Sequence, residues 1–387
     1  MTVALIFGGR GFERDVSIAG ARFVYPLIPR EKYRVVPILI TADGRWLMRA
    51  SDCDRRDGIG LFSAEEFDAE ISKGDDCGAE LPKGEGCGTE LSKGYDCGAE
   101  LPREEDFDLP CAPMNFGDRA GLIYRGGDLT VDCAFPLLHG DFGEDGVVQG
   151  ALENAKIKYV GEDALTSAIC LDKRLTHLIA ARLGIPVARA IFTHPNESCD
   201  AARDRAERLL GYPLFLKPSC LGSSVGASPL RCATHFERAF VEATRLSSRG
   251  LIIEELVDID CELEIGVLAD KSKLIFTNIG KIRADIGFYD YKEKYGEGSP
   301  AAVSAEAHIE ERVAAELKGY AKKLCQFIGI RSLCRIDFFR TKKGEILFNE
   351  INTMPGFTGA SLYPRLMAGV GYPPEKLLDA LISEALL

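Results

Sequence analysis

The chain has 387 residues, 46% of them hydrophobic and 27% charged, which is typical of a globular protein with a sizeable core and allows two or three domains. Its formal net charge of −12 argues against a nucleic-acid or anionic-membrane partner. No apolar run approaches the length of a membrane span, so a membrane protein is not expected.

The thirteen cysteines are an odd number and show no paired CxxC spacing. The N-terminus lacks a basic start and runs directly into a strand pattern, so no signal peptide is expected. Without a secretion signal, free thiols and a cytoplasmic location are favoured.

The first predicted element is a short apolar strand, Val3 to Phe7, followed by Gly8-Gly9 and a helix from about Asp15 to Leu27. Strand, glycine turn and helix is how a doubly wound α/β domain begins, and Val35 to Ile40 reads as its next strand. The turn lacks GxGxxG spacing, which disfavours a dinucleotide site. Glu13 lies in this turn, at the edge where open α/β sheets bind ligands, although taken alone it is better explained as a helix-start carboxylate that complements the helix dipole.

Three near-identical decapeptides follow at residues 73–102. Each repeat contributes one Cys and one Leu, which is little apolar area to offset the cost of ordering its backbone. The even spacing of Cys77, Cys87 and Cys97 could suggest a metal array, but zinc sites usually need closer pairs and no His accompanies them. We therefore expect an exposed insertion without a catalytic part.

A buried strand at Val131 to Leu137 ends at a polar, glycine-rich segment, His139 to Gly146. Such a segment after a strand again indicates the ligand edge of a sheet. Helices are expected at Val147 to Asn154 and at Asp172 to Leu183, and Gly184-Ile185-Pro186 stops the second one.

The segment Lys217 to Gly226 places a Lys at the end of the strand Pro213 to Lys217 and then a Gly/Ser loop. Glycines let backbone N–H groups approach phosphate oxygens, and Ser hydroxyls add donors. The Lys precedes the glycines, so this is not a Walker A sequence, and a flexible surface loop would look the same. Helices are predicted on either side, at Arg203 to Leu210 and Phe236 to Thr244.

Three more strands are predicted at Leu251 to Val257, Cys261 to Leu268 and Leu274 to Ile279. The aromatic and charged segment Phe288 to Tyr295 would, by itself, be only a solvated flap. Ala307 to Phe327 is a long predicted helix.

The segment Arg335 to Asn352 predicts a hairpin with Lys343-Gly344 at its tip, which puts Asp337 opposite Glu350. Glu350 and Asn352 are two residues apart and share a face, as do Arg335 and Asp337. Two carboxylates and an amide oxygen suit Mg²⁺, and a fixed cation beside a metal suits phosphoryl transfer. The alternative is an ordinary hairpin whose polar residues face water.

An irregular loop at Thr353 to Leu362 and a helix near Pro374 to Leu386 follow the hairpin. Taken together, the predicted elements and motifs resemble the D-alanine–D-alanine ligase family, which has the ATP-grasp fold. The match runs in order from Val3 to the C-terminus and fails only around residues 50–125. The matching motifs are His139-Gly140…Gly143-Glu144-Asp145-Gly146…Gln149-Gly150, Leu171-Asp172-Lys173, the Gly222 loop, Tyr289-Asp290-Tyr291…Lys294-Tyr295, Arg335-Ile336-Asp337 and Asn349-Glu350-Ile351-Asn352-Thr353.

The resemblance implies an α/β protein with an N-terminal doubly wound, Rossmann-like (pre-ATP-grasp) domain and a two-lobed ATP-grasp domain. The expected bounds are 1–161 for the N-terminal domain with its repeat insertion at 73–102, 162–254 for the central lobe, and 255–387 for the C-terminal lobe with the metal site.

The family also implies ATP as co-substrate and two divalent ions, Mg²⁺ or Mn²⁺. The expected metal ligands are Asp337 and Glu350 for one ion, and Glu350 and Asn352 for the other. The expected ATP contacts are Lys173 and Lys217 on the phosphates, Ser223, Ser224, Val225 and Gly226 in the flap, Glu254, Glu255 and Val257 at the adenine edge, and Glu262 on the ribose. Cys261 marks a one-residue insertion before Glu262, which weakens that last assignment.

For the amino acids, the resemblance implies that Glu13 holds the ammonium of the first D-alanine, near His139. Ser223 and Tyr295 link to Glu13 and close the loops over the site. Arg335 and the Gly356 amide serve as oxyanion donors. The carboxylate of the second amino acid is expected near Lys294, Ser361 and Leu362.

The implied reaction joins two D-alanines through an acyl phosphate for peptidoglycan precursors, in an enzyme that is commonly a homodimer. D-serine or, after it, D-lactate stays open as second substrate. The segment Asn352-Thr353…Thr358 resembles the lactate type, whereas Tyr295 belongs to the dipeptide-forming types and favours an amine nucleophile. Another ATP-grasp ligase acting on a different carboxylate, and a non-catalytic nucleotide-binding protein, are the remaining alternatives.

Overall fold

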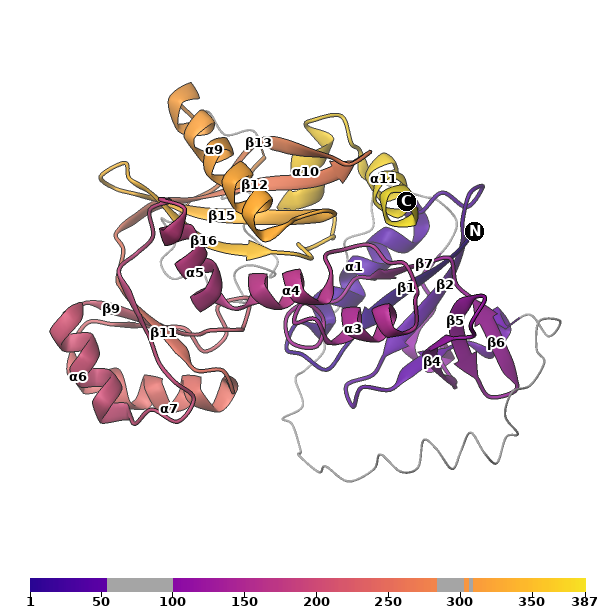
Figure 1. Ribbon diagram of the computed structural model, residues 1–387, viewed down its shortest axis with the longest axis horizontal. Coiled ribbons are helices and arrows are strands. Elements are labelled where there is room, and N and C mark those ends of the chain that lie inside the picture. The colour runs from indigo at the N-terminus through magenta and orange to yellow at the C-terminus, as the bar shows by residue number, and fades with distance from the viewer. Residues whose placement is uncertain (54–99, 284–302, 306–308) are drawn as a thin grey trace.

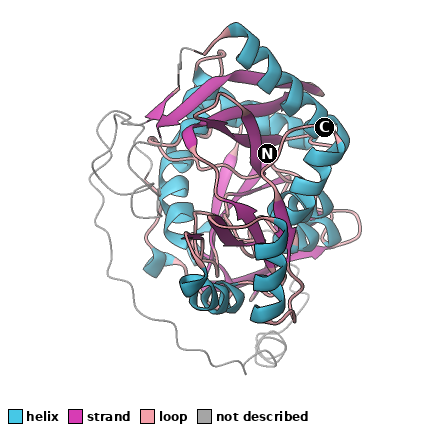
Figure 2. Cartoon of the chain, turned by 90° about the vertical axis from the view of Figure 1, so that its left-hand side faces the viewer, coloured by secondary structure: helices cyan, strands magenta, loops and turns pink. Residues whose placement is uncertain are grey.

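A computed structural model of the chain describes residues 1–53, 100–283, 303–305 and 309–387, which form three sheets with helices around them (Figure 1). The view in Figure 2 shows the helices on the outside and the strands within. The described residues include no helix long and apolar enough to cross a membrane. The ten cysteines among them are all free thiols. The repeat residues 73–99 lie outside the described part, so the expectation for the decapeptides is untested.

The first sheet has seven strands in the order β6-β5-β4-β3-β2-β1-β7. Its strands are β1 (Thr2–Gly8), β2 (Arg34–Ile40), β3 (Trp46–Met48), β4 (Leu109–Asn115), β5 (Ala120–Tyr124), β6 (Gly127–Thr130) and β7 (Cys133–Pro136). β1 is parallel to β2 and to β7, as a doubly wound domain requires, whereas β3 to β6 add an antiparallel extension. The sequence analysis did not predict this extension, which falls where the family resemblance fails. The sheet carries α1 (Arg14–Leu27) and α3 (Val147–Asn154), and 3-10 turns lie at Ala50–Asp52 and Glu104–Asp106.

The turn after β1 fixes where α1 begins. Gly8 has φ of +93°, and a Cβ there would lie 2.3 Å from the Ile40 carbonyl oxygen, so only glycine fits. The Ser17 hydroxyl accepts from the Gly8 amide at 2.9 Å and donates to the Leu137 carbonyl at 2.5 Å. This buried bridge ties the ends of β1 and β7 to the first turn of α1, next to Glu13.

The second sheet is antiparallel, with the order β10-β9-β11-β8. It comprises β8 (Ala190–Phe192), β9 (Leu214–Pro218), β10 (Ser228–Leu230) and β11 (Leu251–Glu255). Helices α6 (Cys199–Leu209) and α7 (Phe236–Leu246) cover it, and a 3-10 turn at Ala233–His235 leads into α7. We call the segment Ala190–Glu255 the four-stranded unit. α6 begins four residues before the prediction because Ser198 caps it by accepting from the Ala201 amide at 3.3 Å.

The third sheet has the order β14-β13-β12-β15-β16. Its strands are β12 (Ile259–Asp270), β13 (Lys273–Arg283), β14 (Val303–Ser304), β15 (Leu333–Thr341) and β16 (Ile346–Asn352). α9 (Glu311–Ile328), α10 (Leu362–Ala368) and α11 (Pro374–Leu386) pack around it, and α4 (Ala164–Leu171) and α5 (Lys173–Arg182) lead into the four-stranded unit. The sequence analysis missed α4 and α10; it also placed the start of the long helix earlier than the observed start of α9.

Two of the three sheets share one hydrophobic core. Phe135 from β7 contacts Phe357 with ring centroids 6.0 Å apart, and Phe357 contacts Tyr363 of α10 at 5.5 Å. The same cluster extends to Leu381 of α11, so the first and third sheets form one packed body, which we call the composite body. The four-stranded unit has a separate core that includes Phe236.

Candidate active site

The β15–β16 hairpin has the predicted pairing at its polar face. Asp337 lies opposite Glu350, and Arg335 opposite Asn352. The intervening Ile336 and Ile351 are buried in the core, so the four polar residues share the other face. The Asn352 amide nitrogen donates to Asp337 at 3.0 Å. The two-residue spacing therefore brings the predicted metal ligands together.

A bulge interrupts this ladder just beyond Asp337, because Asn349 has no partner in β15. The Asn349 side-chain oxygen accepts from Lys217 Nζ at 3.3 Å. The alternating sequence pattern gave no sign of the bulge, so this contact between β16 and the four-stranded unit was not predicted.

Arg335 is held by two carboxylates. It donates to Asp337 through Nε at 2.8 Å and Nη2 at 2.7 Å, and Nε also lies 3.1 Å from a Glu264 oxygen. Glu264 is buried and lies opposite Asp337 on the neighbouring strand β12. The sequence analysis missed Glu264, although it is two residues beyond Glu262 and hence on the same face.

Two buried lysines approach this face from other elements. Lys173, at the start of α5, lies 3.0 Å from Glu350 and donates to the Leu221 carbonyl at 2.7 Å. Burial opposes its charge, but the Glu350 carboxylate prevails, so the pKa of Lys173 lies above its ordinary value. Lys217, at the end of β9, pairs with Glu254 at 3.0 Å. Both ammonium groups are thus fixed at the junction of the four-stranded unit and the β15–β16 hairpin.

Glu13 connects the turn after β1 to the Gly/Ser loop. The Ser223 hydroxyl donates to the Glu13 carboxylate. A Cβ at Gly140 would lie 2.6 Å from a Glu13 oxygen, and one at Gly222 would lie 2.8 Å from it, so both glycines are needed for this approach. Glu13 occupies the N-cap position of α1, where it can complement the helix dipole, but its side chain makes no capping hydrogen bond and accepts from Ser223 instead.

The loop between β9 and β10 has an unusual backbone. Ser223 and Ser224 have φ of 50° and 58°, and Gly226 follows with 72°. Consecutive non-glycine residues in the left-handed region are rare and mark strained segments. Such conformations turn successive N–H groups toward one side, which favours an anion. A small cavity beneath the loop is lined by Phe12, Glu13, Gly140, Asp141, Leu221, Gly222 and Val225.

The segment after β7 supplies a neutral imidazole and two weakened acids. His139 is buried, its Nδ1 lies 2.9 Å from the Met354 carbonyl oxygen, and burial lowers its pKa. Burial, with Asp145 and Glu13 nearby, raises the pKa of Asp141 to about 6. Burial and Glu13 raise the pKa of Glu144 to about 7. The sequence analysis assigned no role to these two acids.

The residues predicted to contact the nucleoside lie on or next to β11 and β12. Glu254 is buried at the end of β11, and Glu255 accepts from the Arg189 amide at 3.0 Å. Val257 follows β11, and Glu262 lies on β12, which has a bulge between Ile259 and Cys261, where the sequence indicated an extra residue.

In the loop after β16, a Cβ at Gly356 would lie 2.9 Å from the Ser361 hydroxyl, which accepts from the Thr358 amide at 2.9 Å. Leu362 is buried at the start of α10. Lys294 and Tyr295 lie outside the described residues.

The donor set fits a hard divalent cation. Asp337 and Glu350 offer carboxylates, each now balanced by a cation, and Asn352 must turn its amide to present the oxygen. Across the described ranges, no three His, Cys, Asp or Glu side chains gather to hold a metal by themselves. Such a site would therefore need the amide and additional ligand oxygens from outside the protein.

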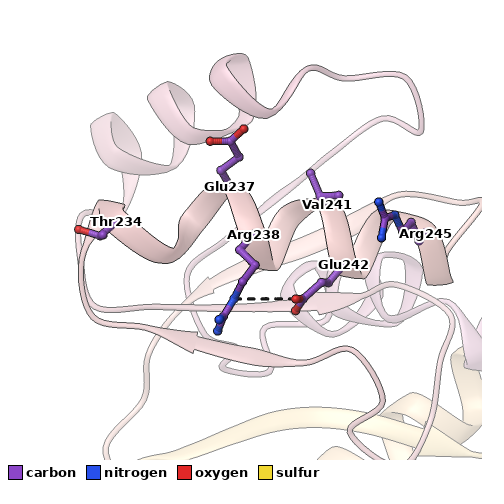
Figure 3. A pocket seen from close by; sticks show the side chains of 6 residues that line it. All are labelled: Thr234, Glu237, Arg238, Val241, Glu242 and Arg245. Carbon is purple, nitrogen blue, oxygen red and sulfur yellow. Dashed lines mark ion pairs between the residues drawn. The ribbon is translucent and has the colours of Figure 1, made fainter.

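Another hollow lies away from these residues, on the outer face of α7 (Figure 3). Arg238 and Glu242 form an ion pair of 3.8 Å there, beside the exposed Val241. None of its lining side chains belongs to the cluster around Glu13 and Asp337.

Comparisons with known proteins cover nearly the whole chain. Residues 2–162 match the family model described as D-ala D-ala ligase N-terminus, and residues 179–383 match D-ala D-ala ligase C-terminus. D-alanine–D-alanine ligase A of Mesorhizobium japonicum is 35% identical, covering 99% of this chain and 97% of the relative. D-alanine–D-alanine ligase of Chlorobium luteolum is 34% identical, covering 100% and 97%.

Solved structures agree with this likeness. The VanG D-Ala:D-Ser ligase of Enterococcus faecalis has a TM-score of 0.76 at 29% identity, covering 99% of each chain. The D-alanine-D-alanine ligase of Coxiella burnetii has a TM-score of 0.75 at 27% identity, covering 100% of this chain and 94% of that one.

Proposed function

The chain belongs to the D-alanine–D-alanine ligase family, and on that premise we propose that the cluster around Glu13, Lys173, Lys217 and the β15–β16 hairpin joins two D-alanines at the expense of ATP. The enzyme is an ATP-dependent ligase with an ATP-grasp fold, and its product, D-alanyl-D-alanine, serves cell-wall synthesis. One observation supports this location best. The hydrogen bond from Ser223 to Glu13 joins the loop between β9 and β10 to the carboxylate that is expected to hold the ammonium of the first D-alanine.

Glu13 and His139 supply the first-substrate subsite in this proposal. The Glu13 carboxylate pairs with the ammonium of the first D-alanine, and neutral His139 adds no competing charge. The small cavity beneath the β9–β10 loop borders Glu13 and Gly140, where the first substrate would bind. The substrate carboxylate then points toward the hairpin.

Phosphoryl transfer requires that negative charge be neutralised. Lys173 and Lys217 would hold the phosphates, with the left-handed Ser223–Ser224 backbone as the cover above them. Two Mg²⁺ or Mn²⁺ ions, held by Asp337, Glu350 and Asn352, would supply Lewis-acid stabilisation when bound. Glu254, Glu255, Val257 and Glu262 would contact the nucleoside.

In the first step the carboxylate of the first D-alanine takes the γ-phosphoryl group of ATP, and ADP leaves. In the second step the amine of the second D-alanine attacks this acyl phosphate, the amide bond forms and inorganic phosphate leaves. Arg335 and the Gly356 amide would stabilise the tetrahedral oxyanion, and loss of one such donor typically costs about 10²–10³ in rate. Ser361 and Leu362 would border the second substrate, together with Lys294, and Tyr295 would help to close the site. We also propose a homodimer in the cytoplasm; sedimentation velocity tests the dimer.

The experiment is a comparison of second substrates. ATP-dependent phosphate release is measured with D-alanine alone and with D-alanine plus D-serine or D-lactate, and the products are identified by mass spectrometry. We expect D-alanyl-D-alanine as the main product. The resemblance to the D-Ala:D-Ser ligase of Enterococcus faecalis keeps D-serine as the second candidate. Absence of turnover with any D-amino acid would refute the proposal.

A further inference from the structure

Two buried glutamates join the N-terminal part of the chain to the two strands of the β15–β16 hairpin. Glu144 follows β7 and accepts a hydrogen bond from an amide just after β16, while Glu162 precedes α4 and accepts from an amide just before β15. Both side chains are largely buried, at 8% and 1% exposure. Because β15 and β16 pair with each other, the glutamates fasten the hairpin at neighbouring strand ends.

The contacts of Glu144 link two loops that the reaction needs in fixed relation. One carboxylate oxygen accepts from the Gly140 amide at 3.0 Å, and the other accepts from the Met354 amide at 2.9 Å. The His139 ring adds a return contact to the Met354 carbonyl at 2.9 Å. Gly140 in turn borders the Glu13 carboxylate.

Glu162 has the same chemistry without the same neighbours. Its oxygens accept from the Ser332 amide at 2.8 Å and from the Arg331 amide at 3.0 and 3.2 Å. Both amides belong to one connection, the start of β15, and neither carries a predicted substrate contact. Glu162 therefore fastens the hairpin but does not connect it to the loop around Glu13.

We propose that Glu144 is a positioning residue that sets the distance between the first-substrate subsite at Glu13 and His139 and the metal-binding end of β16 at Asn352. The inference rests on the proposed roles of those residues. A small misplacement of reacting groups can cost about 10²-fold in rate. A glutamate side chain suits the task because its two oxygens contact different loops, one at Gly140 and the other at Met354.

The experiment compares Glu144→Gln with Glu162→Gln in the full chain. Glutamine keeps the size but turns one acceptor into a donor, which faces an amide N–H in either variant. We measure kcat and KM for D-alanine, ATP affinity by calorimetry without D-alanine, and Tm. For Glu144→Gln we expect kcat/KM for D-alanine to fall about 10- to 100-fold with ATP affinity within twofold. For Glu162→Gln we expect Tm to fall by about as much as in Glu144→Gln, while kcat/KM stays within about threefold of the wild-type value.

Equal losses of kcat/KM in the two variants, in step with their losses of Tm, would overturn the positioning role. If Glu144→Gln does not fold, Glu144→Asp provides the second test. It keeps the charge but is too short to serve both loops, so the same loss of kcat/KM is expected, and wild-type kinetics would count against the inference. Glu13→Gln separates the two proposals: if it leaves the D-alanine KM unchanged, the proposed subsite itself is wrong.

Discussion

An apolar core joins the parts of the composite body to each other, whereas polar contacts link the four-stranded unit to that body. The first and third sheets share one continuous apolar core, in which aromatic rings from β7, the loop after β16 and α10 touch. The four-stranded unit has its own core. Its contacts with the composite body include Ser223 with Glu13, and Lys217 with Asn349, and all of these except Asn349 belong to the proposed site. The composite body thus holds Glu13 and the β15–β16 hairpin on one packed frame, whereas the unit's own core, as far as the structure describes the chain, shares no residue with that frame.

The largest expected effect is on catalysis at the point where the two regions meet. Glu350→Gln removes a proposed metal ligand and the ion-pair partner of Lys173. We expect kcat to fall by about 10²–10³, measured as phosphate release at a temperature where the variant is folded, and Tm to fall as well because buried Lys173 loses its charge partner. Glu345→Gln, at the exposed turn of the same hairpin, is the control and should keep wild-type rates. A Glu350→Gln rate within threefold of wild type would contradict the metal assignment.

The separate cores can be tested by matched truncations. Phe236→Ala in the four-stranded unit and Phe357→Ala in the composite body each remove a buried ring and should cost about 3–5 kcal/mol. We expect scanning calorimetry of Phe236→Ala to reveal an early transition that abolishes ATP binding while the body stays folded. Phe357→Ala should lower the main transition. A single coincident transition in both variants would mean that the two regions unfold together.

The polar connection should matter for binding more than for stability. Ser223→Ala removes the donor to Glu13, and we expect the D-alanine KM to rise about tenfold, as befits one hydrogen bond to a charged group. Ser198→Ala, which removes only the cap of α6, should lower Tm and leave KM unchanged. If both variants behave alike, the Ser223 contact is structural.

The smallest effect concerns pH. Burial raises the pKa of Glu162 to about 7 from an ordinary 4.5, so the folded state binds its proton more tightly than the unfolded state. Its contribution to stability is therefore full below about pH 4.5 and is lost as pH rises through about 7. Glu162→Gln should flatten the decline of Tm between pH 5 and 7.5 by about 2 °C. An unchanged slope would show that other groups set it.

The site could be predicted wherever chemistry follows from local spacing. The two-residue interval between Glu350 and Asn352, and the pairing of Asp337 with Glu350, followed from strand alternation and the hairpin turn. The apolar run before Lys217 and the Gly/Ser residues after it likewise predicted a lysine at the end of a strand, next to a loop. Elements without periodicity were harder: α10 begins at Leu362, where the predicted irregular loop ends, and no element was predicted for the rest of it, because its buried residues pack against β12 and β13 rather than follow a local pattern.

The sequence by itself determined the strands that carry the proposed site residues, most of the helices and the identities of the charged groups, because hydrophobic period and turn residues act over short range. Only the tertiary structure decided that Glu264 would hold Arg335, that a bulge would turn Asn349 toward Lys217, and that Glu144 would join two loops 210 residues apart. Those contacts depend on which elements pack together, and long-range packing is set by the whole core rather than by any local pattern.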